Sequence, residues 1–136
     1  MAVNEPGWED RERPFTPTNL AGDGVLEFTI KGYPAHGGVT QKLHSLEPGA
    51  QLLMSEAFGT ITYQGPGWFI AGGAGITPML AILRTLAAQG RMQEHGLIFA
   101  NQTPADIICE KELRHYLRER CILICDLAAG SGYAEG

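Results

Sequence analysis

The chain has no long apolar run, which excludes the simplest kind of membrane span. Within its 136 residues, no apolar stretch approaches the roughly 18–20 residues that a spanning helix needs. It also has no basic excess, because 10 Lys and Arg stand against 15 Asp and Glu, and a net charge of −5 argues against a nucleic-acid or anionic-membrane partner. The N-terminus lacks the basic start and apolar stretch of a signal peptide.

Cysteine is scarce, and its spacing gives no metal site. The 3 cysteines are Cys109, Cys121 and Cys125, with no Cys-x-x-Cys pair, and the four histidines are scattered. An odd number of cysteines without a signal peptide predicts free thiols in a reducing, cytoplasmic compartment. Cys121 and Cys125 would lie on one face of a strand, where we expect buried core thiols.

The first half of the chain has the alternation of a half-buried strand. At residues 25–31, Leu26, Phe28 and Ile30 fall on one face and polar residues on the other. Residues 51–55 and 59–63 read as two more strands, and residues 39–45 as a short helix. This pattern is typical of an antiparallel sheet or barrel with one small helix.

The pattern changes after Gly65-Pro66-Gly67, the predicted boundary between domains at residues 1–64 and 65–136. Strands are expected at residues 68–71, 96–100 and 121–126, and helices at 78–89 and 103–118. This strand–helix alternation predicts a parallel sheet with crossover helices.

The most informative segment is the glycine turn, residues 72–78, with the sequence Gly-Gly-Ala-Gly-Ile-Thr-Pro. It joins a strand to a helix, and glycine leaves room for a ligand near the backbone. Thr77 is expected to cap the helix and Pro78 to stand in its first turn, where free N–H groups attract phosphate. The segment matches neither Gly-x-Gly-x-x-Gly nor an ATP-binding loop, and a purely structural tight turn is the alternative.

Three further segments carry weaker signals. Arg13-Pro14-Phe15-Thr16 offers a guanidinium for phosphate and an aromatic ring for stacking, although packing alone would also explain it. His36-Gly37-Gly38-Val39-Thr40 is a second anion-binding turn or an ordinary helix start. Asn101 and Thr103 follow the second parallel strand, where they could contact a ribose, although Thr103 could be only a helix cap.

Taken in this order, these motifs resemble the ferredoxin–NADP⁺ reductase superfamily, and within it the flavodoxin- or ferredoxin-reductase type of FAD-binding oxidoreductase. The matching segments are residues 6–10, 13–16, 37–40, 69–78 and 101–108. In that family a β-barrel binds the flavin and an α/β domain binds NAD(P)H. The resemblance therefore implies a partial antiparallel flavin-binding β-barrel in residues 1–64, followed by a partial parallel α/β nucleotide-binding domain in residues 65–136.

The resemblance also implies roles for residues around the flavin. Arg13 would hold its phosphate, Phe15 would stack on the isoalloxazine, and Thr16 would lie near N5, the hydride acceptor. Lys31 and Tyr33 would border the adenine or ribose.

Two turns would hold the phosphates of the two cofactors. By the same resemblance, the flavin pyrophosphate would lie on Gly38, Val39 and Thr40, and Asn101 and Thr103 would contact the adenosine ribose of the nicotinamide cofactor. The nicotinamide-cofactor phosphates would be held by Gly73, Gly75, Ile76, Thr77 and Pro78.

The chemistry implied is hydride transfer between NAD(P)H and FAD, with FMN less favoured, followed by electron transfer to a carrier such as a ferredoxin or flavodoxin. NADH is preferred slightly over NADPH because residues 101–103 contain no Arg, although Arg84 and Arg91 could reach that region. Arg13 lies near the start and the chain stops at Gly136, so the resemblance predicts a form truncated at both ends. A partner chain or homo-oligomer would then complete the fold.

Two other functions remain open from the sequence. One is a non-catalytic nucleotide-binding module that keeps the glycine turn but has no flavin site. The other is a structural domain of a larger electron-transfer assembly. Flavin uptake would distinguish the oxidoreductase from the nucleotide-binding module, and dimer formation that rebuilds the barrel would favour the structural domain.

Overall fold

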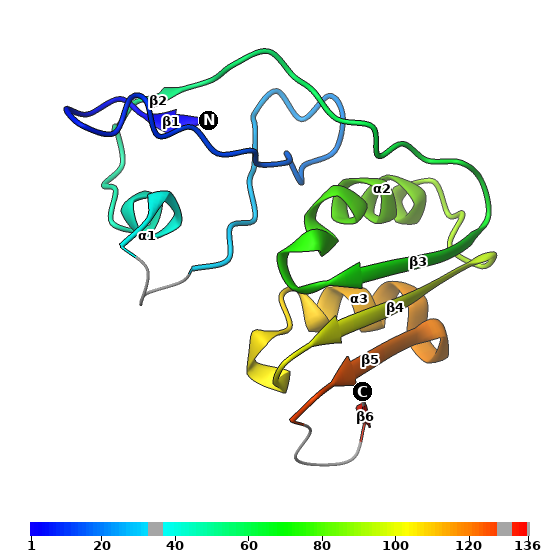
Figure 1. Ribbon diagram of the computed structural model, residues 1–136. Helices are drawn as coiled ribbons and strands as arrows, with labels where there is room; N and C mark the ends of the chain where they lie inside the picture. Colours follow the sequence, from blue (N-terminus) through cyan, green and yellow to red (C-terminus); the bar gives the residue numbers. More distant parts are fainter. Residues whose placement is uncertain (33–36, 128–131, 136) are drawn as a thin grey trace.

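Four parallel strands form the centre of the second half of the chain (Figure 1). The computed structural model describes residues 1–32, 37–127 and 132–135. The strands lie side by side in chain order: β3 (Gly67–Gly72), β4 (His95–Asn101), β5 (Cys121–Cys125) and β6 (Ala134–Glu135). All three pairings are parallel, so the carboxyl ends of these strands meet at one edge of the sheet.

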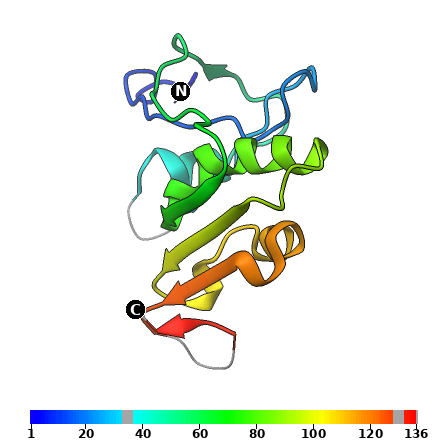
Figure 2. The same cartoon turned by 90° about the vertical axis from the view of Figure 1, so that its right-hand side faces the viewer.

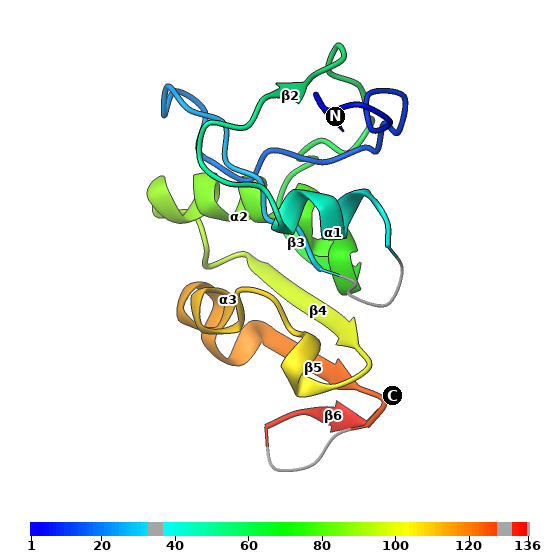
Figure 3. The same cartoon turned by 90° about the vertical axis from the view of Figure 1, so that its left-hand side faces the viewer.

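Two helices cover one face of this sheet. Figures 2 and 3 place α2 (Thr77–Ala88) and α3 (Glu110–Leu117) on the same side of the strands. Helical spacing directs Leu80, Leu83 and Leu86 of α2 inward, and all three are buried. The predicted strand–helix order of this half is therefore confirmed, including the buried thiols of Cys121 and Cys125.

The opposite face of the sheet carries apolar side chains that the described residues do not cover. Along β3, Trp68 is 54% exposed and Ile70 is 69% exposed, whereas Ala71 is buried. Ile70 stands in register with Ile98 of β4, and Ile98 with Ile122 of β5, so an apolar row crosses three strands. Parallel sheets normally have both faces covered, which makes this open face unusual.

The first half contains much less regular structure than the sequence predicts. Its elements are β1 (Ala2–Val3) and β2 (Leu52–Leu53), which pair antiparallel, and the helix α1 (Val39–His44). The helix at residues 39–45 is thus confirmed. Among the described residues of this half, the predicted barrel is not formed, because pairing beyond β1–β2 is limited to one bridge between Pro17 and Phe28.

Two predicted strands of the first half are wrong. Residues 25–31 form only the bridge at Phe28, and residues 59–63 form no strand. The reason is the lack of a surface to pack against, since Leu26 is 62% exposed and Ile61 is 59% exposed. Alternation indicates a strand with one buried face, and here the described chain supplies no layer to bury it.

The helix predicted at residues 103–118 is divided in the structure. A 3₁₀ turn covers Pro104–Asp106, α3 begins only at Glu110, and a second 3₁₀ turn covers Arg118–Arg120. The break occurs at Cys109, whose φ of +55° is left-handed and incompatible with a continuing helix. Among the described helices, none is long and apolar enough to cross a bilayer.

Candidate functional site

The glycine turn presents bare backbone at the carboxyl end of β3. A 3₁₀ turn spans Gly73–Ile76 and passes directly into α2. Gly73 has a φ of +49°, which favours glycine, and a Cβ atom added at Gly73 or Gly75 would meet no atom within 4 Å. Ile76 is fully buried and fixes the turn to the core. The turn is therefore anchored to the core by Ile76, and its glycine backbone is open to a ligand.

The start of α2 is suited to an anion, although Thr77 does not cap it as predicted. Ile76 occupies the capping position without a side-chain hydrogen bond, and the Thr77 hydroxyl donates instead to the carbonyl of Ala74 at 3.1 Å. Thr77 is already helical, so its side chain reaches back into the preceding turn. Pro78 does stand in the first turn, which contains no acidic residue that would repel a phosphate.

Asn101 ends β4 beside this turn, and its amide has no hydrogen-bond partner. The residue is 7% exposed, and neither Oδ1 nor Nδ2 is bonded to the described chain. Gly72 is in register with Ala100, so Asn101 follows one residue beyond the level at which β3 ends. Buried amides are almost always paired, which marks Asn101 as a group available to a ligand.

Thr103 belongs to a small polar cluster that joins the two halves of the chain. Its backbone N–H and its hydroxyl both donate to Asp106 Oδ2, at 3.2 and 2.7 Å. Lys31 of the first half places its ammonium 3.0 Å from Asp106 Oδ1. The hydrogen bond from Thr103 and then the ammonium of Lys31 lower the pKa of Asp106, so this carboxyl stays ionised. Lys31, expected at the adenine or ribose of the flavin, thus contacts Asp106 next to Thr103, a residue expected at the ribose of the nicotinamide cofactor.

Among the described residues, no recorded contact joins the Arg13–Thr16 segment to the glycine turn. Arg13 is exposed, and its Nη1 donates to the carbonyl of Glu12 at 2.8 Å. Phe15 and Thr16 are half-buried. The roles predicted for these residues stay predictions.

The second turn lies at the start of α1. Gly38 is the residue before the helix, Val39 is 5% exposed and packs inward, and Thr40 is half-buried. No side chain caps this helix and no acidic residue stands in its first turn. Tyr33 and His36 lie outside the described residues.

The two halves face one another across the carboxyl ends of the strands. In Figure 1 the arrowheads of β3, β4 and β5 point toward the side on which α1 lies. Ligands of open parallel sheets bind at this edge. Arg84 and Asp106 make ion pairs that join the two halves, to Glu27 and Lys31 respectively. From the sequence, Arg84 is expected only as a residue that could reach the ribose region, and neither ion pair is predicted. The Thr103-x-x-Asp106 spacing predicts a capping box, which the structure forms, but it carries no signal of the ion pair with Lys31.

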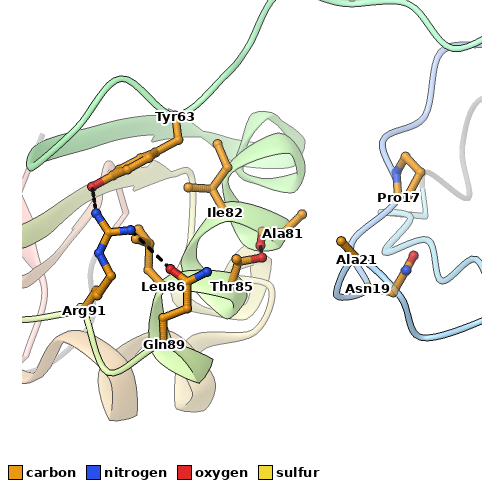
Figure 4. A pocket seen from close by; sticks show the side chains of 10 residues that line it. All are labelled: Pro17, Asn19, Ala21, Tyr63, Ala81, Ile82, Thr85, Leu86, Gln89 and Arg91. Atoms are coloured by element: carbon orange, nitrogen blue, oxygen red, sulfur yellow. Dashed lines mark hydrogen bonds between the residues drawn. The ribbon is translucent and has the colours of Figure 1, made fainter.

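A separate pocket of about 450 Å³ lies away from these residues (Figure 4). It runs along the outer side of α2, with Tyr63 and Arg91 at one end and Pro17 at the other. Arg91 stacks on the Tyr63 ring, with its guanidinium carbon 5.6 Å from the ring centre. The pocket shares no residue with the predicted site. Among the described residues, no group of His, Cys, Asp and Glu side chains could hold a metal ion.

A known protein-family model matches the second half of the chain. Residues 69–125 match the model of the oxidoreductase NAD-binding domain, a range that includes the glycine turn, Asn101 and Thr103.

Relatives and solved structures extend this match to most of the chain. NADH–cytochrome b5 reductase 1 of Arabidopsis thaliana is 37% identical over 113 residues, covering 77% of this chain and 39% of the relative. NADH–cytochrome b5 reductase 2 of Homo sapiens is 32% identical, covering 78% and 49%. The chain thus spans less than half the length of either relative.

Two solved structures share the fold. The cytochrome b5 reductase domain of Ulva prolifera nitrate reductase has a TM-score of 0.67 at 25% identity, covering 91% of this chain and 57% of that one. The FAD/NAD-binding domain of a Vibrio cholerae nitric oxide dioxygenase has a TM-score of 0.74 at 19% identity, covering 99% and 62%.

Proposed function

Because this chain belongs to the ferredoxin–NADP⁺ reductase superfamily, we propose that it forms the flavin- and NADH-binding part of an oxidoreductase that passes electrons from NADH to a protein carrier. The observation that carries the proposal is the unpartnered buried amide of Asn101 beside the open glycine turn. An amide without a protein partner and a backbone without side chains together fit the ribose and phosphates of a dinucleotide.

Within this proposal the second half binds NADH. The glycine turn and the start of α2 offer N–H groups to the pyrophosphate, with Gly73, Gly75, Ile76, Thr77 and Pro78 forming the surface. Asn101 and Thr103 hold the adenosine ribose. The preference for NADH over NADPH is supported by the names of the relatives and by the lack of Arg in residues 101–103.

The first half contributes the flavin contacts. Arg13 binds the flavin phosphate, and Phe15 and Thr16 border the isoalloxazine ring. Gly38, Val39 and Thr40 hold the pyrophosphate of FAD at the start of α1. When bound, the flavin and nicotinamide supply hydride transfer, and the residues of this chain bind both, align their rings and exclude water.

The wider setting is also a proposal. We expect the first half to belong to a flavin-binding barrel, and a ferredoxin-, flavodoxin- or cytochrome b5-like carrier to accept the electrons. A homo-oligomer or a second chain would complete the site. Three free thiols support a reducing, cytoplasmic location.

A visible absorption spectrum, recorded before and after addition of FAD and then desalting, tests the proposed function. We expect bands near ~450 nm that survive desalting and bleach on anaerobic addition of NADH. Binding of NADH without flavin uptake would favour the non-catalytic nucleotide-binding module. Binding of neither would overturn the proposal.

A further inference from the structure

Arg84, on the outer side of α2, uses its guanidinium to join three separate segments. Its Nε and Nη2 donate to the two carboxylate oxygens of Glu112 on α3, at 2.7 and 3.0 Å. Its Nη1 donates to the carbonyl of Thr18 and to Glu27 Oε1, both at 2.6 Å. The Arg84 side chain is only 19% exposed, so this is a partly desolvated contact rather than a surface pair.

The acceptor in the first half is itself a fixed structure. Thr18 is fully buried, and its backbone N–H donates to the carbonyl of Glu27 at 2.7 Å. Its hydroxyl is 3.0 Å from that of Thr29 and donates to Glu27 Oε1 at 3.1 Å. Arg84 therefore holds a cross-linked loop, not a single mobile side chain.

This loop begins two residues after Thr16, the last residue of the proposed ring-contacting segment. On the other side, Arg84 lies two helical turns after Thr77, at the end of the glycine turn. The proposed cofactor contacts are thus close in the chain to the same guanidinium, from Thr16 through the hydrogen bond of Thr18 and from Thr77 through the helix α2. Because α2 is a regular helix and Thr18 is buried, we expect little relative movement between the two cofactor-contacting segments.

The charges of this cluster are stable near neutral pH. Hydrogen bonds from Arg84 lower the pKa of Glu112 and also that of the more exposed Glu27. The partnered carboxylates in turn raise the pKa of Arg84, which stays a cation.

We infer that Arg84 is a positioning residue, which sets the distance between the flavin-contacting segment at Phe15–Thr16 and the nucleotide-binding glycine turn. This inference rests on the proposed function, because it concerns the alignment of the same two rings. Arg84 touches neither cofactor in this role. A change at its contacts should alter hydride transfer more than it alters binding.

The tie is tested first without any cofactor, by hydrogen–deuterium exchange of Glu27→Ala. We expect amides in residues 18–29 to exchange about fivefold faster, which is the effect expected for the loss of the ion pair between Glu27 and Arg84. Glu119→Ala is the matched control, because Glu119 is 79% exposed and lies 3.9 Å from Arg120. Equal exchange in the two variants would overturn the inference.

The role of the tie is tested next by anaerobic stopped-flow reduction of the FAD-loaded protein. For Glu27→Ala we expect flavin and NADH dissociation constants within about twofold of the original, and a bleaching rate at saturating NADH lowered about tenfold or more. Arg84→Lys should also bleach slowly, because one ammonium cannot replace the planar fork.

The other outcomes of the exchange and bleaching experiments distinguish the positioning role from the proposed function. Faster exchange with an unchanged bleaching rate would overturn the positioning role and leave the proposed function intact. Failure of the original protein to bind flavin would overturn both, and the exchange experiment would still report whether the tie exists.

Discussion

At the scale of single residues, Asn101 separates binding from folding. A buried amide without a partner costs free energy in the unliganded chain, and nothing in the described structure offsets it. Such a residue is expected where a ligand completes the hydrogen bonds. Its neighbours Leu97 and Phe99 on the same strand are fully buried and apolar, so the backbone position itself tolerates an apolar side chain.

Asn101→Leu should therefore stabilise the unliganded protein and weaken nucleotide binding. We expect the free energy of unfolding to rise by about 1 kcal/mol, because an unsatisfied polar group is replaced by an apolar one of similar size. The dissociation constant for NADH should rise about tenfold. Urea denaturation and a fluorescence titration with NADH measure the two effects. A variant that is less stable and binds NADH normally would contradict the assignment.

Gly96 is a residue whose substitution is limited by one neighbour. A Cβ atom there would lie 2.5 Å from the nearest atom of the Trp68 ring, which covers Gly96 on the open face of the sheet. Gly96→Ala should lower the free energy of unfolding by about 2 kcal/mol through this overlap. The double variant Gly96→Ala/Trp68→Leu should recover most of that loss in urea denaturation. If it does not, the overlap with Trp68 is not the cause.

At the scale of elements, the packing of α2 against α3 depends on an ionised Glu112. Its pKa is lowered chiefly by the hydrogen bond from Arg84, starting from an ordinary value of 4.5. A depressed folded-state pKa means that this stabilisation is present above pH 4.5 and is lost as the pH falls through the lowered folded-state value. The acid side of the stability curve should therefore be steep.

Glu112→Gln should flatten this acid side. We expect the urea midpoint of the variant to be lower than that of the original protein at pH 7 and to fall less between pH 5 and 3, because one proton-linked group is removed. Urea titrations across this range measure it, with Glu119→Gln as the control. A slope equal to that of the original protein would show that Glu112 does not contribute.

The elements that could be predicted from sequence are those with local punctuation. β3 and α2 are bounded by Gly or Pro, β4 and β5 are short apolar runs, and the structure confirms all four. The predicted strand at residues 25–31 does not form, because its pairing strand and packing surface would have to come from elsewhere in the chain. The break in the helix at Cys109 was not predicted, because no sequence signal marks a non-glycine residue with a left-handed φ.

The site divides in the same way. The glycine turn and Pro78 follow from residue types alone, because backbone freedom and a fixed φ are local properties. The position of Lys31 on Asp106 and the three contacts of Arg84 join residues far apart in the chain, so spacing could not reveal them. Side-chain pairs of this kind require the tertiary fold.

At the scale of the whole molecule, the open face of the sheet is the surface through which we expect the protein to associate. Apolar patches of this kind on a parallel sheet promote association. Ile70→Lys places a charge in the apolar row. The new side chain would point away from the core, since Ile70 is 69% exposed. We expect the variant to remain monomeric at concentrations at which the original protein associates, as measured by light scattering on a sizing column. Equal association of the variant and the original protein would show that the protein does not associate through this face.

The same face has an optical consequence. The chain has 2 tryptophans, and Trp68 lies on Gly96 with 54% of its surface exposed, whereas Trp8 lies under the Arg11 guanidinium in the first half. In a Trp8→Phe background, the remaining indole would emit at long wavelength while the face is wet and shift toward the blue when any chain covers it. The protein therefore carries an intrinsic fluorophore at the position where a covering layer would first be felt.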